Sequence, residues 1–279
     1  MTDLFNKISE KTSKITTSTY STSFSFGISI LANKFHQPIY NIYGFVRFAD
    51  EIVDSLHEYN QSYLLQKFEK DCFDAIKQKV SLNPILNSFQ KVVNNYNIDL
   101  NLIELFIHSM KMDLEKDQLY NEEKYKKYII GSAEAVGLMC LYVFLEGNTK
   151  MYHELKPFAQ KLGSAFQKVN FLRDIKNDYQ DLNRTYFPNI DIKKFNDNDK
   201  EKIEQDIELD FEIAYKGIIL LPKEARGGVY LSYIYYLTLL KKIKSIAAEN
   251  LLQKRIRVPN YIKIILLIKA LVKNKINLI

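Results

Sequence analysis

Apolar residues recur every three or four positions from one end of the chain to the other, which is the spacing of α-helices. Only 9 glycines and 6 prolines interrupt the 279 residues, and such sparse breaks favour long helices over β-hairpins. The helices that we expect span residues 2–17, 22–34, 38–57, 61–79, 83–96, 99–116, 122–146, 150–181, 198–220, 224–248 and 260–276. No linker rich in glycine, serine or proline divides the chain, so the pattern predicts an all-α protein with a single domain over residues 1–279.

Helix boundaries are marked by prolines and by short polar side chains. Pro38 and Pro84 suit the first turn of a helix, where a missing N–H group costs little. Asp99 or Asn101 can cap the next helix by accepting a hydrogen bond from its first free N–H groups. The longest loop that we expect runs from residue 181 to about residue 199.

The composition limits the kinds of partner. With 47% hydrophobic residues the chain can bury a substantial core, and its net charge of +6 fits an anionic substrate or membrane surface. It has no nucleic-acid-binding motif and no compact basic run, so we do not expect nucleic acid as a partner. Cys72, Cys140 and four dispersed histidines lack metal-ligand spacing, which argues against a zinc site. The first residues lack the features of a signal peptide, so we expect a cytoplasmic protein.

Two polar stripes run along otherwise apolar helices. Their members are Tyr43, Arg47, Asp50 and Asp54 in the first stripe, and Gln167, Asn170, Asp174 and Asp178 in the second. In each stripe the residues follow the spacing i, i+3 or i+4, i+7 and i+11, so they share one helix face. A solvent-exposed face normally carries charge over a broader arc, and these narrow stripes therefore favour a buried polar site.

Each stripe ends in an Asp-x-x-x-Asp pair, and a buried pair of this kind needs cations nearby. Like charges four residues apart repel, and burying them is costly unless cations neutralise them. Carboxylate oxygens suit Mg²⁺, which completes its shell with water and phosphate. Arg47 and Arg173 beside the acids are suited to bind diphosphate oxygens. A single pair would more often be a solvated surface feature, but two such stripes favour the chemical interpretation.

The ordered set of motifs resembles the squalene/phytoene synthase family over nearly the whole chain, and among its members the bacterial phytoene synthases. Tyr20-Ser21-Thr22-Ser23-Phe24 is similar to the family's Ser-x-Ser-Phe element, and the two acidic stripes resemble its two aspartate-rich motifs. The loop Asn183–Pro188 resembles the flap that follows the second motif, and Tyr236 and Arg255 match late positions that reach the site.

This resemblance implies the isoprenoid synthase fold, an all-α domain around a central cavity. It implies Mg²⁺, or Mn²⁺ in its place, held by Asp50, Asp54, Asn170, Asp174 and Asp178. Substrate binding is implied for Tyr20, Ser21, Thr22, Ser23, Tyr43, Arg47, Gln167, Arg173, Tyr236 and Arg255. The catalytic set implied is Asp50, Asp54, Asp174, Asp178, Arg47, Arg173 and Tyr236.

The reaction implied is the head-to-head condensation of two geranylgeranyl diphosphates to phytoene, a step of carotenoid biosynthesis, through a cyclopropylcarbinyl diphosphate. No NADPH is expected. The first alternative is a dehydrosqualene or squalene-pathway synthase that joins two farnesyl diphosphates. More distant alternatives are a non-catalytic scaffold protein of the same fold and a lipid-binding module, although a scaffold should have lost acids that are all present here.

Two details of the pattern add expectations. The family's Tyr-x-Tyr-x-Val-Ala-Gly-x-Val-Gly stretch reads Tyr128 to Gly137 here, with Ile130 in place of a tyrosine and Glu134 in place of a glycine. Glu134 should therefore reach a cation or water, because burying it alone would be costly. Candidates for the aromatic wall of the cavity are Phe24, Phe26, Phe45, Phe166 and Tyr236.

Residues 261–273 are apolar with interspersed lysines, and the uncharged stretch is too short to span a bilayer. Two interpretations stay open. The segment caps the core as a terminal helix, which is the commoner arrangement, or it lies in the membrane interface with its lysines among the headgroups. The second interpretation would place the protein peripherally on the inner face of the membrane.

Overall fold

The computed structural model describes residues 2–115, 120–180, 184–253 and 255–279, and within these ranges the chain forms helices and no β-strand. The first half contains α1 (Thr2–Tyr20), α2 (Thr22–Ile30), α3 (Asn33–Asp54), α4 (Gln61–Gln78), α5 (Pro84–Tyr96), α6 (Leu100–Asp113), α7 (Glu122–Ile129), the π-helix η1 (Ile130–Glu134) and α8 (Ala135–Leu145). The second half contains α9 (Thr149–Gln180), the 3₁₀ turn η2 (Ile192–Lys194), α10 (Asp197–Ile218), α11 (Lys223–Lys244), α12 (Ala248–Leu251) and α13 (Asn260–Lys275). The all-α prediction is confirmed.

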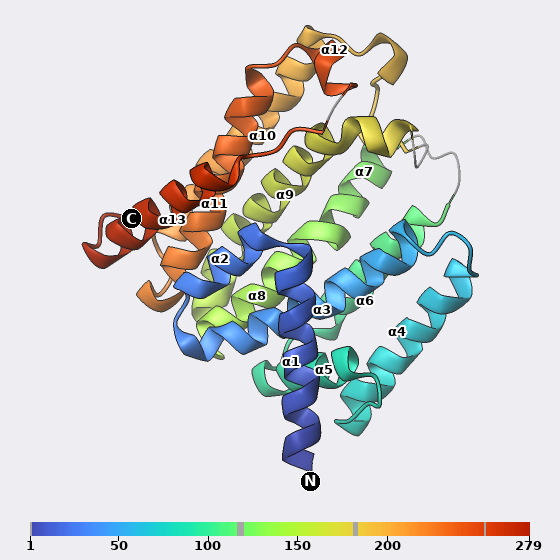
Figure 1. Cartoon of the computed structure of the whole chain (residues 1–279), viewed down its shortest axis with the longest axis vertical. Helices are drawn as coiled ribbons and strands as arrows, with labels where there is room; N and C mark the ends of the chain where they lie inside the picture. Colours follow the sequence, from blue (N-terminus) through green and yellow to red (C-terminus); the bar gives the residue numbers. More distant parts are fainter. Residues whose placement is uncertain (1, 116–119, 181–183, 254) are drawn as a thin grey trace.

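Helix α3 carries the first acidic stripe, and the opposite face of this helix is firmly packed. Phe35 and Phe45 are 0% exposed, and the ring of Phe45 stacks on Phe89 with centroids 3.9 Å apart. This face packs against α1 and α5, which lie on one side of the bundle (Figure 1). The packing fixes the rotation of α3, so its polar stripe turns toward the interior between α3, α8 and α9.

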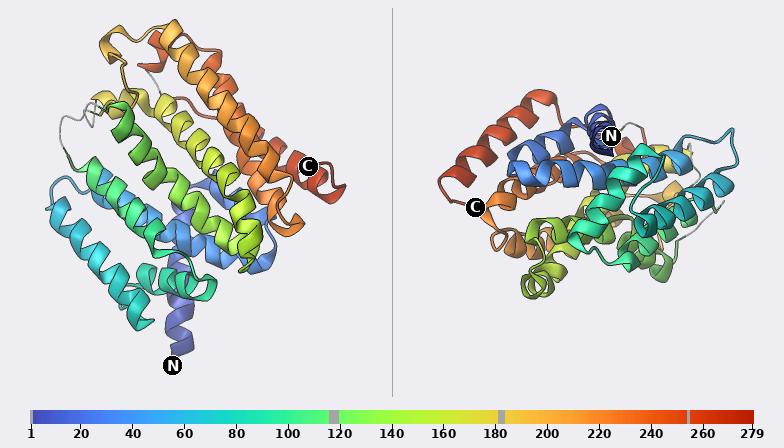
Figure 2. Two further views of the ribbon diagram at one scale, coloured as in Figure 1. Left: turned by 180° about the vertical axis from the view of Figure 1, so that it is seen from behind. Right: turned by 90° about the horizontal axis from the view of Figure 1, so that it is seen from below.

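Helix α9 carries the second stripe and runs between α8 and α10, as the view from behind shows (Figure 2). Its buried residues Ala165, Val169 and Leu172 are 0% exposed. Behind them, Lys168 forms ion pairs with Asp206 and Asp210 of α10, with Nζ–Oδ2 distances of 2.5 and 2.7 Å. These contacts hold the stripe of α9 opposite that of α3.

The apolar stretch Glu122–Leu145 combines α7, η1 and α8 into 24 continuous helical residues. By length and composition alone it could cross a membrane, but 56% of its most apolar window is buried within the fold, as in the core helix of a globular protein. At Gly131 the helix comes so close to α6 that a Cβ atom would lie 2.3 Å from the carbonyl oxygen of Leu105. The π-helical turn therefore lies at a close approach of this helix to α6.

The predicted helix boundaries hold closely at most positions, and Pro84 and Asp99 begin and cap their helices as expected. Pro38 is an exception: α3 begins at Asn33 and continues through it, so placing Pro38 in the first turn was wrong. Burial of Phe35 and Ile39 against the core outweighs the hydrogen bond that proline removes. Part of the predicted 181–199 loop lies outside the described residues.

Two more expectations on helix ends were imprecise. The helix expected over 22–34 ends at Ile30, and a new one begins at Asn33. The helix expected over 224–248 ends at Lys244, and the short α12 follows it.

Candidate active site

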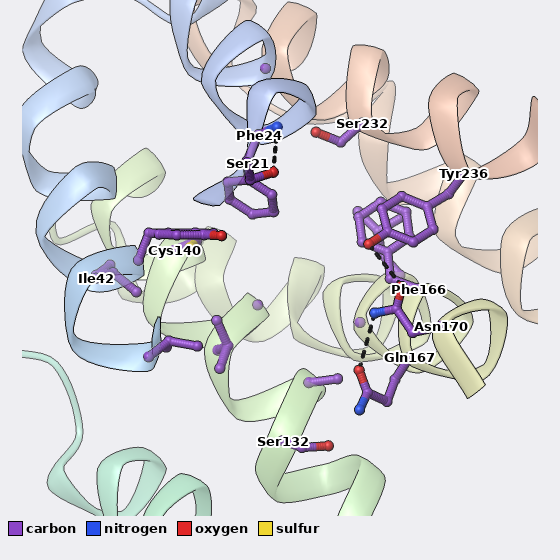
Figure 3. Close-up of a pocket in the computed structure, with 18 of the residues that line it drawn as sticks. Ser21, Phe24, Ile42, Ser132, Cys140, Phe166, Gln167, Asn170, Ser232 and Tyr236 are labelled. Atoms are coloured by element: carbon purple, nitrogen blue, oxygen red, sulfur yellow. Dashed lines mark hydrogen bonds between the residues drawn. The ribbon is translucent and has the colours of Figure 1, made fainter. Parts of the chain in front are cut away.

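A cavity of about 590 Å³ lies between α2, α3, α8, α9 and α11. One part of its lining is apolar and includes Ile28, Leu31, Phe144, Leu155 and Phe158. Figure 3 shows Ser21 and Phe24 on one wall and Gln167 and Asn170 on another. A volume of this size is typical of sites that enclose a small molecule.

All eight members of the two polar stripes line this cavity. In the first stripe, the guanidinium of Arg47 lies 4.2 Å from the ring centroid of Tyr20 and forms an ion pair with Glu51. The Nε atom of Arg47 is buried and forms no hydrogen bond within the described residues. Burial raises the pKa of the Tyr43 hydroxyl to about 12, so this group remains a proton donor at neutral pH. This side of the cavity therefore offers several donors to an anion.

In the second stripe, hydrogen bonds connect the polar groups to each other and to α11. The hydroxyl of Tyr236 donates to Oδ1 of Asn170 at 3.2 Å, and the amide of Asn170 donates to Gln167 at 3.4 Å. The ring of Tyr236 stacks on Phe166 with centroids 4.0 Å apart (Figure 3). Tyr236 is thus held against the second stripe, and it lines the cavity.

The four aspartates differ in how their charge is balanced. Asp174 lies between Arg173 and Arg255, with the Nε atom of Arg255 2.6 Å from Oδ1, and Asp54 pairs with Arg184 at 3.0 Å. Neither Asp50 nor Asp178 forms an ion pair within the described parts of the chain. The site therefore holds two balanced and two unbalanced carboxylates.

The unbalanced pair has strongly raised pKa values. Burial, and then the neighbouring Asp54, raise the pKa of Asp50 to about 8. Burial and the neighbouring Asp174 do the same for Asp178, whose pKa is also about 8. Two carboxyl groups that ionise so reluctantly would be stabilised by a cation placed beside them.

The donor set fits magnesium bound together with diphosphate. In the described residues no group of three or more Asp, Glu, His or Cys side chains is close enough to hold one ion by itself. Mg²⁺ commonly takes only one or two carboxylates and fills its shell with phosphate oxygens and water. The unbalanced Asp50 and Asp178, each in a pair one helical turn apart, match that requirement.

The structure adds a cluster at the cavity that the sequence analysis did not single out. Its centre is Asp113 at the end of α6, whose side chain is 3% exposed. The hydroxyls of Tyr128 and Tyr186 donate to its two oxygens at 2.8 and 3.1 Å, and Arg184 lies 3.6 Å away. All four residues line the cavity.

Arg184 connects this cluster to the first stripe. Its Nη2 atom donates to the backbone carbonyl oxygen of Asp113 at 2.8 Å, and its Nη1 atom donates to Asp54. Burial raises the pKa of Asp113 to about 6 even though Arg184 opposes this shift. The loop that contains Arg184 is therefore tied to both α3 and α6 at the edge of the site.

One sequence signal could have revealed Asp113. It follows Phe106 and Met110 at seven and three residues, so a carboxylate continues the apolar stripe of its helix. A lone acid at a core position is costly unless it has partners, and this makes it a site candidate. The partner tyrosines come from distant segments and carry no comparable signal.

Some predicted residues lie away from the cavity. Thr22 is exposed and accepts a hydrogen bond from Lys263 at 3.2 Å, while Ser23 borders a small crevice beside α11 and α13. Because α2 begins at Thr22, successive side chains turn by about 100°, and only Ser21 and Phe24 of this segment face the cavity with Tyr20. Placing Thr22 and Ser23 with the diphosphate-binding groups is not supported by this geometry.

Of the aromatic wall candidates, Phe24, Phe166 and Tyr236 line the cavity. Phe45 is 0% exposed in the core between α3 and α5, and Phe26 borders the crevice beside Ser23. The expectation for Phe45 and Phe26 was wrong, because each side chain lies on the opposite face of its helix from the cavity.

The two departures from the family pattern have local explanations. Ile130 is 37% exposed and does not line the cavity, whereas Tyr128 does. Glu134 accepts a hydrogen bond from the Gln160 amide at 2.8 Å, and the positive charges of Lys161 and Lys168 also act on it. Burial raises the pKa of Glu134.

Residues 17–261 match the sequence model described as squalene/phytoene synthase. The chain is 24% identical to 4,4'-diapophytoene synthase of Staphylococcus haemolyticus over 67% of its own length and 65% of that protein. It is 26% identical to phytoene synthase 1 of Solanum lycopersicum, in an alignment that covers 81% of this chain and 59% of that protein. It is 28% identical to presqualene diphosphate synthase of Rhodopseudomonas palustris over 60% of its length and 58% of that protein. The chain thus spans about three fifths of the length of these relatives.

Solved structures share the same architecture. A dehydrosqualene synthase in complex with ligand superposes with a TM-score of 0.79 at 22% identity, over 97% of this chain and 98% of that one. Squalene synthase HpnC of Alicyclobacillus acidocaldarius superposes with a TM-score of 0.73 at 17% identity, over 86% of this chain and 94% of that one. The helical arrangement around the cavity is therefore the isoprenoid synthase fold.

Proposed function

Since the chain belongs to the squalene/phytoene synthase family, we propose that it joins two prenyl diphosphates head to head and releases both diphosphates. The observation that carries this proposal is the position of two acidic stripes, with arginines beside them, on a cavity that is otherwise lined by many apolar side chains. The polar groups suit two diphosphates, and the apolar lining suits two isoprenoid chains.

The polar residues of the cavity would bind and orient the leaving groups. Arg47 offers a buried Nε–H donor, and Arg173 and Arg255, which lie beside Asp174, would be further donors to diphosphate oxygens. Asp50 and Asp54 on one side, and Asn170, Asp174 and Asp178 on the other, would hold Mg²⁺, with Mn²⁺ able to serve in its place. When bound, the metal would neutralise charge on the departing diphosphate as a Lewis acid.

The reaction proceeds in two steps, a condensation and a rearrangement. The C1–O bond of one prenyl diphosphate breaks and leaves an allylic cation, the double bond of the other chain attacks this cation, and loss of a proton closes a cyclopropane ring. The second diphosphate then leaves, the ring rearranges, and loss of a second proton gives the hydrocarbon. Both steps pass through carbocations, which water would quench, so the apolar lining protects the intermediates.

For the substrate, we propose two geranylgeranyl diphosphates and the product phytoene, without NADPH. The resemblance to bacterial phytoene synthases and the similarity to a plant phytoene synthase support this assignment. The second candidate is the joining of two farnesyl diphosphates. The 4,4'-diapophytoene synthase and the dehydrosqualene synthase structure, both similar to this chain, favour it.

The experiment is incubation of the protein with each diphosphate and Mg²⁺, with and without NADPH, followed by identification of the hydrocarbon. We expect phytoene from the C20 substrate without NADPH. A C30 product from farnesyl diphosphate alone would support the second candidate. Release of no pyrophosphate from either substrate would support a scaffold or lipid-binding role instead.

The aspartates provide the first test at residue level. Asp50→Asn and Asp174→Asn keep the side-chain shape but remove a charge that the metal needs, and we expect turnover to fall by about 10³-fold or more. The measurement is steady-state pyrophosphate release, with Asp71→Asn as the control because Asp71 lies in an exposed ion pair of α4. Undiminished turnover in the two site variants would refute the metal assignment.

A further inference from the structure

Helix α13 has a narrow buried edge and a wide exposed apolar face. Leu266 and Ala270 are 9% and 0% exposed, and the helix packs on α11 and α2 through this edge. On the other side, six apolar side chains are 47–66% exposed, and we call them the outer face of α13: Tyr261, Ile264, Ile265, Ile268, Leu271 and Val272. Their spacing keeps them on one stripe, and large contiguous apolar surfaces of this kind mark interaction sites.

This face lies at the edge of the molecule. In Figures 1 and 2, α13 lies on the rim of the bundle in each view, with the C-terminus beside it. The outer face is therefore accessible along the whole helix.

The charge around this face has one sign. Helix α13 contains four lysines and no aspartate or glutamate, and Arg255 and Arg257 precede it. Within the described residues none of these lysines forms an ion pair: Lys263 donates to Thr22, Lys273 lies 5.5 Å from the ring of Tyr230, and Lys269 and Lys275 are exposed. An apolar stripe flanked by unpaired lysines matches the pattern of helices that lie in a membrane interface.

We propose that the outer face of α13 docks on an anionic lipid bilayer, with its apolar side chains among the acyl chains and its lysines at the headgroups. A second copy of the chain fits less well, because a twofold contact would bring two sets of lysines together without acids to balance them. Helices α2 and α11, on which α13 lies, also line the cavity through Gly27, Gly228 and Ser232. Docking would therefore hold the cavity beside the lipid.

The test is flotation of the full-length chain with vesicles of phosphatidylcholine and phosphatidylglycerol, compared with vesicles of phosphatidylcholine alone. We expect the chain to float with the anionic vesicles and to be released by high salt, because salt screens the lysines. Lys269→Gln combined with Lys275→Gln should weaken partition by about 25-fold, since each lysine near an anionic surface contributes about fivefold.

The apolar contribution has its own variant and matched control. Ile264→Ser, Ile265→Ser and Ile268→Ser together should lower partition by at least about tenfold, while the edge that packs on α11 is unchanged. The control carries the same number of changes on exposed residues of another face, Tyr63→Ser, Val80→Ser and Leu82→Ser, and should float like the wild type. Melting followed by circular dichroism verifies that all variants fold.

Two results would overturn the proposal. The first is that the wild type floats with neither kind of vesicle; if it then forms a dimer that the α13 variants dissociate, the face is assigned to a second copy. The second is that the α13 variants float as well as the wild type. Neither of these outcomes depends on whether the protein is catalytically active, so they are separate from the proposed function.

Discussion

At the scale of single residues, Asp113 shows how one buried carboxylate organises the edge of the site. It accepts hydrogen bonds from Tyr128 and Tyr186 and lies beside Arg184, which in turn pairs with Asp54. The residues come from α6, α7, the loop after α9 and α3. Removing the charge should therefore loosen groups from several segments at once.

Asp113→Asn tests this role. Asparagine retains the shape of the side chain but loses the charge beside Arg184, and its amide would face a tyrosine hydroxyl that needs an acceptor. We expect turnover to fall about 10- to 100-fold, which corresponds to losing a hydrogen bond to a charged group. Pyrophosphate release measures the effect, and a melting curve verifies the fold. Wild-type turnover in this variant would show that the cluster has no part in holding the site.

Two residues also show where a prediction from a sequence motif fails. Thr22 and Ser23 belong to a motif that resembles a diphosphate-binding element, yet the turn of α2 takes them away from the cavity. The order of residues in a motif does not by itself show which of its consecutive side chains lie on the same face of the helix.

At the scale of elements, the π-helix η1 lies where α6 and α9 closely approach the continuous helix Glu122–Leu145. A Cβ atom at Gly131 would lie 2.3 Å from the carbonyl oxygen of Leu105, and one at Gly163 of α9 would lie 2.8 Å from the carbonyl oxygen of Ala133. These glycines allow three helices to approach within backbone contact.

Gly131→Ala tests this approach. The added methyl group must push α6 and η1 apart, and we expect the free energy of unfolding to fall by about 2–3 kcal/mol even though alanine favours helix. Gly137→Ala in the same helix is the control, because its Cβ would lie an ordinary 3.4 Å from Ala159. Urea denaturation measures both, and equal midpoints would contradict the predicted clash.

The pairing of α9 with α10 depends on a buried carboxylate. Asp210 is 2% exposed and pairs with Lys161 and Lys168, and Ser164 donates to it at 2.7 Å. Burial alone would raise the pKa of Asp210, but these three partners hold it below the ordinary value. Its stabilising effect is therefore present at neutral pH and is lost as the pH falls below the range in which free aspartate ionises.

Asp210→Asn should lower the free energy of unfolding by about 3 kcal/mol, because it leaves Lys168 buried without its closest fully buried partner. Asp206→Asn is the matched control: it also pairs with Lys168, but its side chain is 60% exposed, and the expected loss is below about 1 kcal/mol. Chemical denaturation at neutral pH compares the two variants. A larger effect at Asp206 would reverse our assignment of the buried pair.

At the scale of the whole molecule, the site is built from both halves of the chain, so ligand binding should stabilise the entire fold. We expect Mg²⁺ with an unreactive prenyl diphosphate analogue, at about 100 times its Kd, to raise the Tm by about 5–10 °C. Chelation of the metal should remove most of this shift, because the acidic stripes repel diphosphate without it.

The control for this experiment is Asp174→Asn, which should show little shift under the same conditions. Thermal unfolding followed by circular dichroism is the measurement. A shift that persists fully after chelation would mean that the analogue binds without metal, contrary to the site proposed here.

Local relationships along one helix were determined by the sequence alone. The spacing of Tyr43, Arg47, Asp50 and Asp54 places them on one face whatever the rest of the chain does, because it follows from the pitch of the α-helix. The same holds for the second stripe, for most helix positions and for the cap at Asp99. These features depend on residues within one or two turns of each other, so the order of residues is sufficient to predict them.

Only the tertiary structure decided which segments meet. It brought Asp113 and Arg184 to the cavity, left Asp50 and Asp178 without a balancing charge, and extended α3 through Pro38. It also turned the apolar side of α13 outward instead of into the core. Each of these outcomes depends on packing between helices far apart in the sequence, where burial energies outweigh local preferences and no spacing rule applies.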